Sequence, residues 1–163
     1  MALGQLPAGL SLWHPAAFLA TWGGSGLLPR APGTWGSLFS LPFAWVIAER
    51  WGSEALFIAA AITLFIGLWA SEQYLKYSTS KDPGAIVIDE TAGQFLALAL
   101  VPPEFWWYAA GFVLFRIADI FKPWPASWAD RSLKGAIGVM TDDIFAAVYA
   151  LVVLYGAHLL LAG

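Results

Sequence analysis

The chain has 163 residues, of which 12% are charged and 60% hydrophobic, with a net charge of −3 and no cysteine. An ordinary soluble domain carries about 25% charged residues, so this composition favours an integral membrane protein over a very apolar soluble helical bundle. Without cysteine there are no disulfides, no thiolate nucleophile and no Cys-ligated zinc, and without a basic stripe nothing indicates a nucleic-acid partner. The length suits a single domain spanning residues 1–163.

Apolar segments, taken in chain order, predict a series of helices. Residues 15–22 are expected to lie in the membrane interface or to re-enter the membrane. Residues 36–49 carry Pro42, which should kink this helix or start its main part. Residues 55–75 form the clearest spanning helix, because about twenty residues at ~1.5 Å each cross ~30 Å of hydrocarbon.

Three further segments complete the predicted bundle. Residues 88–101 are too short to span upright and end at Pro102 and Pro103, since proline lacks the N–H that a helix needs. Residues 104–121 open with aromatic side chains suited to a membrane–water interface, and residues 142–162 are long enough to span. We therefore expect an all-α fold, an integral membrane helical bundle of about four to five transmembrane or membrane-embedded helices.

Helices that alternate in direction bring most charged residues to one face of this bundle. Only Arg50 among the cations falls on the opposite face. The cations on the shared face are Arg30, Lys76, Lys81, Arg116, Lys122, Arg131 and Lys134. The positive-inside rule places this face in the cytoplasm. The acids on the same face are Asp82, Asp89, Glu90, Asp119, Asp130, Asp142 and Asp143.

Two acidic doublets, Asp89-Glu90 and Asp142-Asp143, are each predicted to open a helix. Acids at a helix start accept the free N–H groups and suit the positive end of the dipole, but one acid would suffice for that. Two doublets that independent helices bring to one membrane face are better explained as ligands for a hard cation such as Mg²⁺, which prefers carboxylate oxygens.

Three charged residues of the predicted helix 104–121 and the loop after it, Arg116, Asp119 and Lys122, are spaced i, i+3, i+6 and share one face. Snorkelling to the headgroups explains the two cations, but it does not explain an acid near the membrane. A metal ligand flanked by two phosphate-binding cations accounts for all three residues.

The segment LPRAPGTWGSL, residues 28–38, predicts a turn followed by a helix start. Pro32 and Gly33 form the bend, and Thr34 or Ser37 can cap the helix. A helix N-terminus with Arg30 nearby is a natural anion site, although turn chemistry alone also explains the segment.

The remaining chemistry indicates a phosphoryl reaction. Without cysteine, and with neither histidine suitably placed, thiol-dependent and His-dependent phosphatase mechanisms are excluded. Carboxylates, Mg²⁺, Arg and Lys at a lipid–water boundary are suited to phosphoryl chemistry on a lipid headgroup.

Four segments, LPRAPGTWGSL, IVIDETAG, FRIADIFKPWP and GVMTDDIFAA, resemble the phosphatidylglycerophosphatase A family in their order and spacing, from about Leu28 to Ala147. The resemblance implies an all-α bundle with a central helix. It also implies a multi-pass, Mg²⁺-dependent enzyme of the bacterial inner membrane that acts among membrane lipids in phospholipid biosynthesis. Such an enzyme removes the terminal phosphate of phosphatidylglycerophosphate, giving phosphatidylglycerol and inorganic phosphate.

The resulting hypothesis assigns a role to each candidate site residue. The predicted Mg²⁺ ligands are Asp89, Glu90, Asp142 and Asp143. Asp119 is a further ligand or the general base, and the predicted catalytic residues are Asp119, Asp143 and Asp89. The predicted substrate-binding residues are Arg30, Thr34, Arg116 and Lys122. An alternative is a small membrane transporter that uses its acids as an ion pathway. That alternative predicts polar residues throughout the membrane depth, whereas this sequence gathers them at one end.

Overall fold

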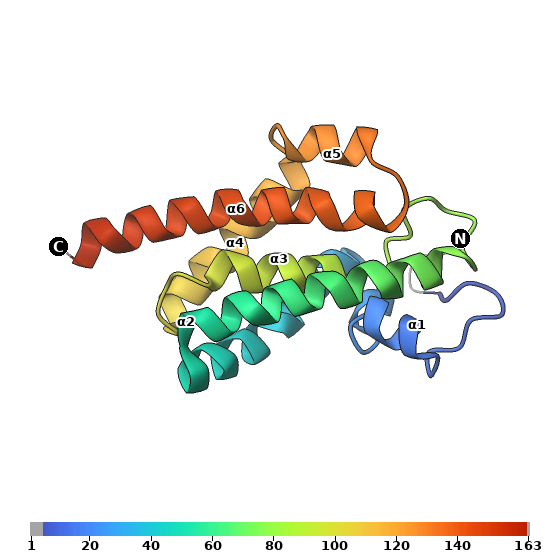
Figure 1. Cartoon of the computed structure of the whole chain (residues 1–163), viewed down its shortest axis with the longest axis horizontal. Helices are drawn as coiled ribbons and strands as arrows, with labels where there is room; N and C mark the ends of the chain where they lie inside the picture. The colour runs from blue at the N-terminus through green and yellow to red at the C-terminus, as the bar shows by residue number, and fades with distance from the viewer. Residues whose placement is uncertain (1–4, 163) are drawn as a thin grey trace.

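The computed structural model describes residues 5–162, and within that range every regular element is helical (Figure 1). The elements are α1 (Pro15–Ala20), a short 3-10 helix η1 (Ser25–Leu27), α2 (Pro32–Leu75), α3 (Ile88–Leu98), α4 (Phe105–Phe121), α5 (Ala126–Ser132) and α6 (Gly135–Ala162). The expectation of an all-α fold is therefore confirmed.

Helix α2 is a hairpin of two arms rather than one straight rod. Gly52 interrupts it with φ 82° and ψ −179°, a conformation that glycine adopts without steric cost. The first arm runs to this turn at the left of Figure 1 and the second arm returns beside it. The arms correspond to the predicted helices 36–49 and 55–75. The first arm begins at Pro32, in the first helical turn where a missing N–H costs nothing, so Pro42 does not start the helix.

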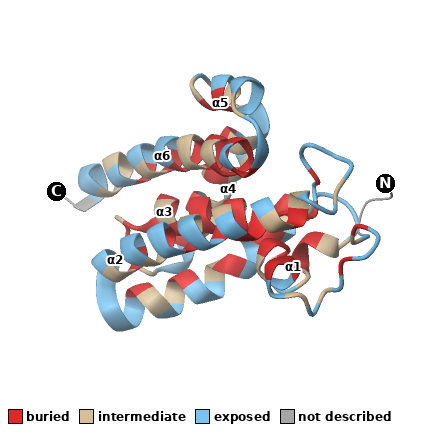
Figure 2. Cartoon of the chain, turned by 45° about the vertical axis from the view of Figure 1, so that its right-hand side comes forward, coloured by how far each residue is buried: buried red, intermediate tan, exposed pale blue. Residues whose placement is uncertain are grey.

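Helix α3 is the centre of the bundle, as the family resemblance implied. It contacts α2, α4 and α6, and nearly all of its residues are buried. Figure 2 shows the buried residues in the middle of the molecule, where the helices face one another. At eleven residues α3 is about 16 Å long, too short to cross a membrane, so it relies on its neighbours for burial.

Two helices of the described chain, α2 and α6, are long and apolar enough to cross a membrane. In each, only 22% of the most apolar 18-residue window is buried within the molecule. Large apolar side chains such as Phe43, Phe65 and Ile62 on α2, and Val152 and Leu160 on α6, are exposed instead. A helix that is apolar all round and still uncovered by protein is typical of a membrane span.

The connection from α4 to α6 differs most from the prediction. Helix α4 matches the expected range, but the short α5 was not predicted, and α6 begins at Gly135 rather than at residue 142. The expectation that Asp142-Asp143 opens a helix is therefore wrong, because this doublet lies two turns inside α6. The predicted segment 15–22 forms α1, whose buried alanines pack against α2.

Candidate active site

A cavity of about 750 Å³ lies at the end of the bundle where both ends of α2 meet the starts of α3 and α6 and the end of α4. This volume is within the range of pockets that bind small molecules. Its charged lining comprises seven carboxylates and five cations. The carboxylates are Asp82, Asp89, Glu90, Asp119, Asp130, Asp142 and Asp143. The predicted gathering of charge at one end is confirmed.

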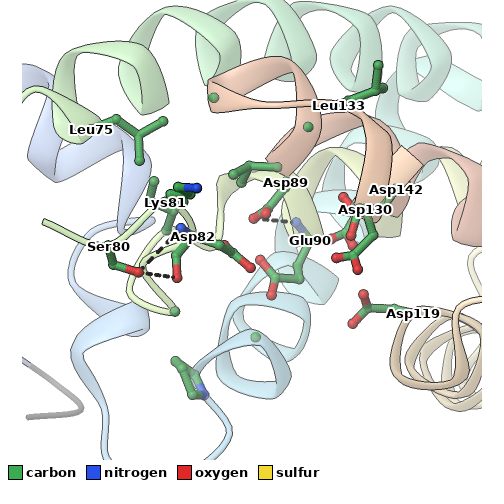
Figure 3. A pocket seen from close by; sticks show the side chains of 18 of the residues that line it. Leu75, Ser80, Lys81, Asp82, Asp89, Glu90, Asp119, Asp130, Leu133 and Asp142 are labelled. Atoms are coloured by element: carbon green, nitrogen blue, oxygen red, sulfur yellow. Dashed lines mark hydrogen bonds between the residues drawn. The ribbon is translucent and has the colours of Figure 1, made fainter. Parts of the chain in front are cut away.

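Two clusters of carboxylates meet inside the cavity. Asp89, Glu90 and Asp143 form the first cluster, and Asp119, Asp142 and Asp143 form the second. Within each cluster, one oxygen from every residue lies within 4.8 Å of the others. Asp143 belongs to both clusters, and Figure 3 shows the side chains of Asp89, Glu90, Asp119 and Asp142 gathered in one space. The two doublets thus converge as the sequence predicted.

The two doublets reach the cavity from different backbone positions. Asp89 and Glu90 occupy the first turn of α3, where Asp89 Oδ1 accepts a hydrogen bond of 3.0 Å from the Glu90 N–H. Asp142 and Asp143 lie inside α6, where the backbone N–H groups are already paired, so capping does not explain them. Asp89 and Asp142 are 7% exposed and Asp143 is 3% exposed. Carboxylates buried this deeply are costly unless a cation or hydrogen bonds compensate them.

Two cations reach into the clusters from the end of α4. Arg116 Nη1 lies 2.7 Å from Asp119 Oδ2 and 3.8 Å from Glu90 Oε1, so it links α3 to α4. Lys122 Nζ donates to Asp130 on α5 and to Asp142 on α6, at 2.5 Å each. Both cations therefore lie where a phosphate bound at the clusters would need positive charge.

Lys122 is held in an unusual backbone conformation that directs it to this position. It caps the end of α4 with φ 45° and ψ 62°, a left-handed conformation that costs a residue with a side chain roughly 1–2 kcal/mol. Partial burial disfavours its charge, but hydrogen bonds and attraction from Asp130 and Asp142 outweigh that effect. The pKa of Lys122 is consequently raised above its usual value, and the ammonium stays charged.

The carboxylates retain capacity for a metal ion. Buried oxygens of three of them, Glu90 Oε2, Asp142 Oδ1 and Asp143 Oδ2, have no hydrogen-bond partner among the described residues. Buried ionised oxygens without partners are strongly destabilising. Arg116 and Lys122 pair with other oxygens of the clusters and leave these three without a partner. Clustered carboxylate oxygens are the ligands that hard divalent cations prefer. The site could therefore hold a metal ion.

The start of α2 closes one side of the cavity. A Cβ added at Gly33 would overlap the Glu90 carboxylate and would lie 3.1 Å from Arg116 Nη1, so only glycine lets this turn approach so closely. Ala31, Pro32 and Gly33 line the cavity, which brings the positive end of this helix dipole toward the carboxylates and any bound anion.

The predicted residues Arg30 and Thr34 do not line the cavity, although their neighbours do. Arg30 is exposed, and Thr34 makes no cap, because Ala31 takes the N-cap position of α2 without a side-chain hydrogen bond. Neither histidine lines the cavity: His14 caps α1, and His158 packs against Trp107.

Sequence reasoning placed four further lining residues on the correct face without selecting them for the site. They are Lys81, Asp130, Arg131 and Lys134. The alternation of helix directions was the signal that could have found them, because it already grouped them with the acidic doublets.

A cavity that combines Arg and Lys with clustered carboxylates that could hold a metal ion has groups suited to the hydrolysis of a phosphate ester. The model of the family described as Phosphatidylglycerophosphatase A matches residues 18–158. The chain is 40% identical over 147 residues to phosphatidylglycerophosphatase A of Escherichia coli (strain K12), a match that covers 90% of this chain and 85% of that protein. The chain therefore belongs to the phosphatidylglycerophosphatase A family, and it is a lipid phosphatase, a hydrolase.

Two further relatives were found. Phosphatidylglycerophosphatase A of Haemophilus influenzae is 37% identical over 147 residues, covering 90% of each chain. A Bacteroides thetaiotaomicron protein, provisionally named a phosphatidylinositol-3-phosphatase, is 37% identical over 144 residues, covering 80% of this chain and 86% of that protein. No solved structure matches the chain. Membership of an enzyme family favours an enzyme over the transporter alternative.

Proposed function

We propose that this protein is a Mg²⁺-dependent phosphatidylglycerophosphatase. It hydrolyses the terminal phosphomonoester of phosphatidylglycerophosphate, giving phosphatidylglycerol and phosphate in phospholipid biosynthesis. The observation that carries the proposal is the convergence of Asp89-Glu90 and Asp142-Asp143 beside Arg116 and Lys122 in one cavity. The names of the Escherichia coli and Haemophilus influenzae relatives support the choice of substrate.

The two acidic doublets, three of whose carboxylates have an unpartnered buried oxygen, are the metal ligands in this proposal. Asp89, Glu90, Asp142 and Asp143 would hold Mg²⁺, with Asp119 as a further ligand or as the general base. When bound, Mg²⁺ supplies Lewis-acid polarisation of the phosphoryl oxygens and a lowered pKa for a coordinated water. As a general base, Asp119 would accept the proton of the attacking water through the carboxylate that now contacts Arg116.

Arg116 and Lys122 bind and orient the phosphomonoester in this proposal. The Arg116 guanidinium is held by Asp119 and Glu90, so it is positioned before substrate arrives. Lys122 donates to two carboxylates and keeps a third N–H for a phosphate oxygen. Charge-assisted hydrogen bonds from both groups stabilise the negative charge that develops on phosphorus oxygens. Arg30 and Thr34 stay predictions for the same role, near the start of α2.

The membrane would surround the apolar part of the bundle and leave the cavity at the cytoplasmic face. Both arms of α2, together with α4 and α6, would cross the bacterial inner membrane, with α3 enclosed between them. The cations that line the cavity satisfy the positive-inside rule for that orientation. Exposed Trp124 and Trp128, which lie in the sequence between the lining residues Lys122 and Asp130, suit the headgroup region. The lipid substrate would then reach the carboxylates from the inner leaflet.

Phosphate release from phosphatidylglycerophosphate by the purified protein in detergent tests the function. We expect release that EDTA abolishes and that added Mg²⁺ restores. Phosphatidylinositol-3-phosphate serves as the comparison substrate, because the Bacteroides thetaiotaomicron relative carries that name. Release that is insensitive to the chelator would contradict the metal assignment, and faster hydrolysis of the inositol lipid would contradict the substrate.

A further inference from the structure

The five cations that line the cavity fall into two groups. Arg116 and Lys122 are largely buried against carboxylates and take part in every ion pair of the described chain. Lys81, Arg131 and Lys134 are exposed at the edge of the same cavity and make no ion pair with a described residue. We call these three residues the rim cations. They come from three separate segments: the loop after α2, helix α5, and the link from α5 to α6.

The size of the cavity shows that a single phosphate does not fill it. A volume of about 750 Å³ belongs to pockets that enclose molecules of many more atoms. The balance of charge in the cavity also favours a ligand with more than one anionic group. Without the rim cations, the seven carboxylates would face only Arg116 and Lys122, and a polyanionic ligand would be repelled at the entrance.

We propose that the rim cations form a second anion subsite, which binds the phosphodiester of the lipid while its phosphomonoester lies at the carboxylate clusters. This inference rests on the proposed function, because phosphatidylglycerophosphate carries both groups, joined by one glycerol. The subsite would let the enzyme favour a phosphomonoester lipid that also has a phosphodiester over phosphatidic acid, which has only the phosphomonoester.

Arg131 is the best-defined member of the subsite. Its Nε donates a 2.9 Å hydrogen bond to the Ser127 carbonyl, one turn earlier on α5. This bond fixes the guanidinium on α5 and leaves its terminal N–H groups for a ligand. A planar guanidinium held in this way suits two oxygens of one phosphate.

The competing explanation is a general attraction of exposed cations to anionic lipid headgroups. Lys76 separates the two explanations, because it is exposed at the same end of the molecule but does not line the cavity. Its Nζ donates to Gln73 Oε1 at 2.9 Å. A general attraction would involve Lys76 as much as any rim cation, whereas a subsite would not.

The test compares two lipids with the same acyl chains, phosphatidylglycerophosphate and phosphatidic acid, in detergent with Mg²⁺. For the combined variant Lys81→Gln, Arg131→Gln and Lys134→Gln, we expect KM for phosphatidylglycerophosphate to rise about tenfold, since charge-assisted hydrogen bonds are lost. The kcat/KM for phosphatidic acid should change less than about twofold, and Lys76→Gln should leave both lipids unaffected. Circular dichroism of each variant checks folding.

Two inhibitors report the two subsites separately. Phosphatidylglycerol has the phosphodiester without the phosphomonoester, so its inhibition constant should rise about tenfold in the combined variant. Inorganic phosphate should bind at the carboxylate clusters, so its inhibition constant should stay the same in the combined variant. Equal losses on both lipids, an unchanged KM, or the same effect from Lys76→Gln would overturn the subsite. A parent protein that releases no phosphate from phosphatidylglycerophosphate would instead refute the proposed function itself.

Discussion

The two acidic doublets have the same chemistry but different structural settings. Asp89-Glu90 lies in the first turn of α3, where an acid also stabilises a helix end, and Asp89 accepts a hydrogen bond from the next residue. Asp142-Asp143 lies two turns inside α6, where it has no such use. Only the packing of α3 against α6 explains why both doublets meet. The meeting of the two doublets is therefore set by the contact between these helices, and not by a preference of acids for helix starts.

The largest expected effect of a substitution in the two doublets is at Asp143, the one residue shared by both carboxylate clusters. We expect Asp143→Asn to lower kcat by about 100-fold or more, because it removes charge from both clusters at once. Steady-state phosphate release measures the effect, with thermal unfolding as a check on folding. Glu54→Gln is the matched control, since this exposed acid lies near the Gly52 turn and outside the cavity. Full activity of Asp143→Asn would count decisively against the site.

A smaller loss is expected when only one cluster is changed. Asp89 belongs to the first cluster and Asp142 to the second, so each Asn variant should lose about 10-fold to 100-fold in activity and need more Mg²⁺ for half-maximal rate. Asp89 lies in the first turn of α3 and not at its N-cap, Val87, so Asp89→Asn keeps a side-chain oxygen that can accept from the Glu90 N–H while it loses the charge. Titration with Mg²⁺ gives the readout. If Asp89→Asn were as active as the parent at every Mg²⁺ concentration, the first doublet would be only a helix-end feature.

The close approach of α2 to the first doublet gives the next prediction. Gly33→Ala would push a methyl group into the Glu90 carboxylate and displace it, with an expected loss of about tenfold in activity. Gly156→Ala is the control, because a Cβ there meets nothing within 4 Å. That substitution should keep activity and stabilise α6 by about 0.5–1 kcal/mol. The measurements are the rate of phosphate release and the thermal unfolding of both variants. Equal activity of the two variants would mean that Gly33 does not position Glu90.

The sequence predicted the long apolar helices from their hydrophobic runs, and it predicted the convergence of the acids from the alternating directions of successive helices. Helix α4 was predicted within one residue, since proline and charge bound its apolar run. Helix α5 was missed because seven residues after Pro125 are too few to show a period. The early start of α6 was missed because GAIGVMT contains two glycines and Lys134 before it is not a capping residue, whereas Thr141, directly before the doublet, is one.

The contacts around Lys122 could not be read from the sequence at all. They depend on the left-handed end of α4, which turns this side chain toward two other helices. Arg30 was selected because an arginine beside a helix start is a common anion site, yet its side chain is exposed and does not line the cavity. Local patterns identified the kinds of groups involved, whereas tertiary packing decided which of them face one another.

The smallest predicted loss of activity concerns the two acids that Lys122 contacts, because they differ in burial and in cluster membership. Asp142 is buried and belongs to a carboxylate cluster, whereas the Asp130 side chain is 40% exposed and belongs to neither cluster. An exposed ion pair contributes about 1 kcal/mol at most, so Asp130→Asn should lower activity by no more than about fivefold. The fold loss of activity should be clearly larger in Asp142→Asn than in Asp130→Asn when both variants are measured at the same Mg²⁺ concentration. Equal losses in the two variants would mean that both acids act only by holding Lys122, and that Asp142 has no separate role at the second cluster.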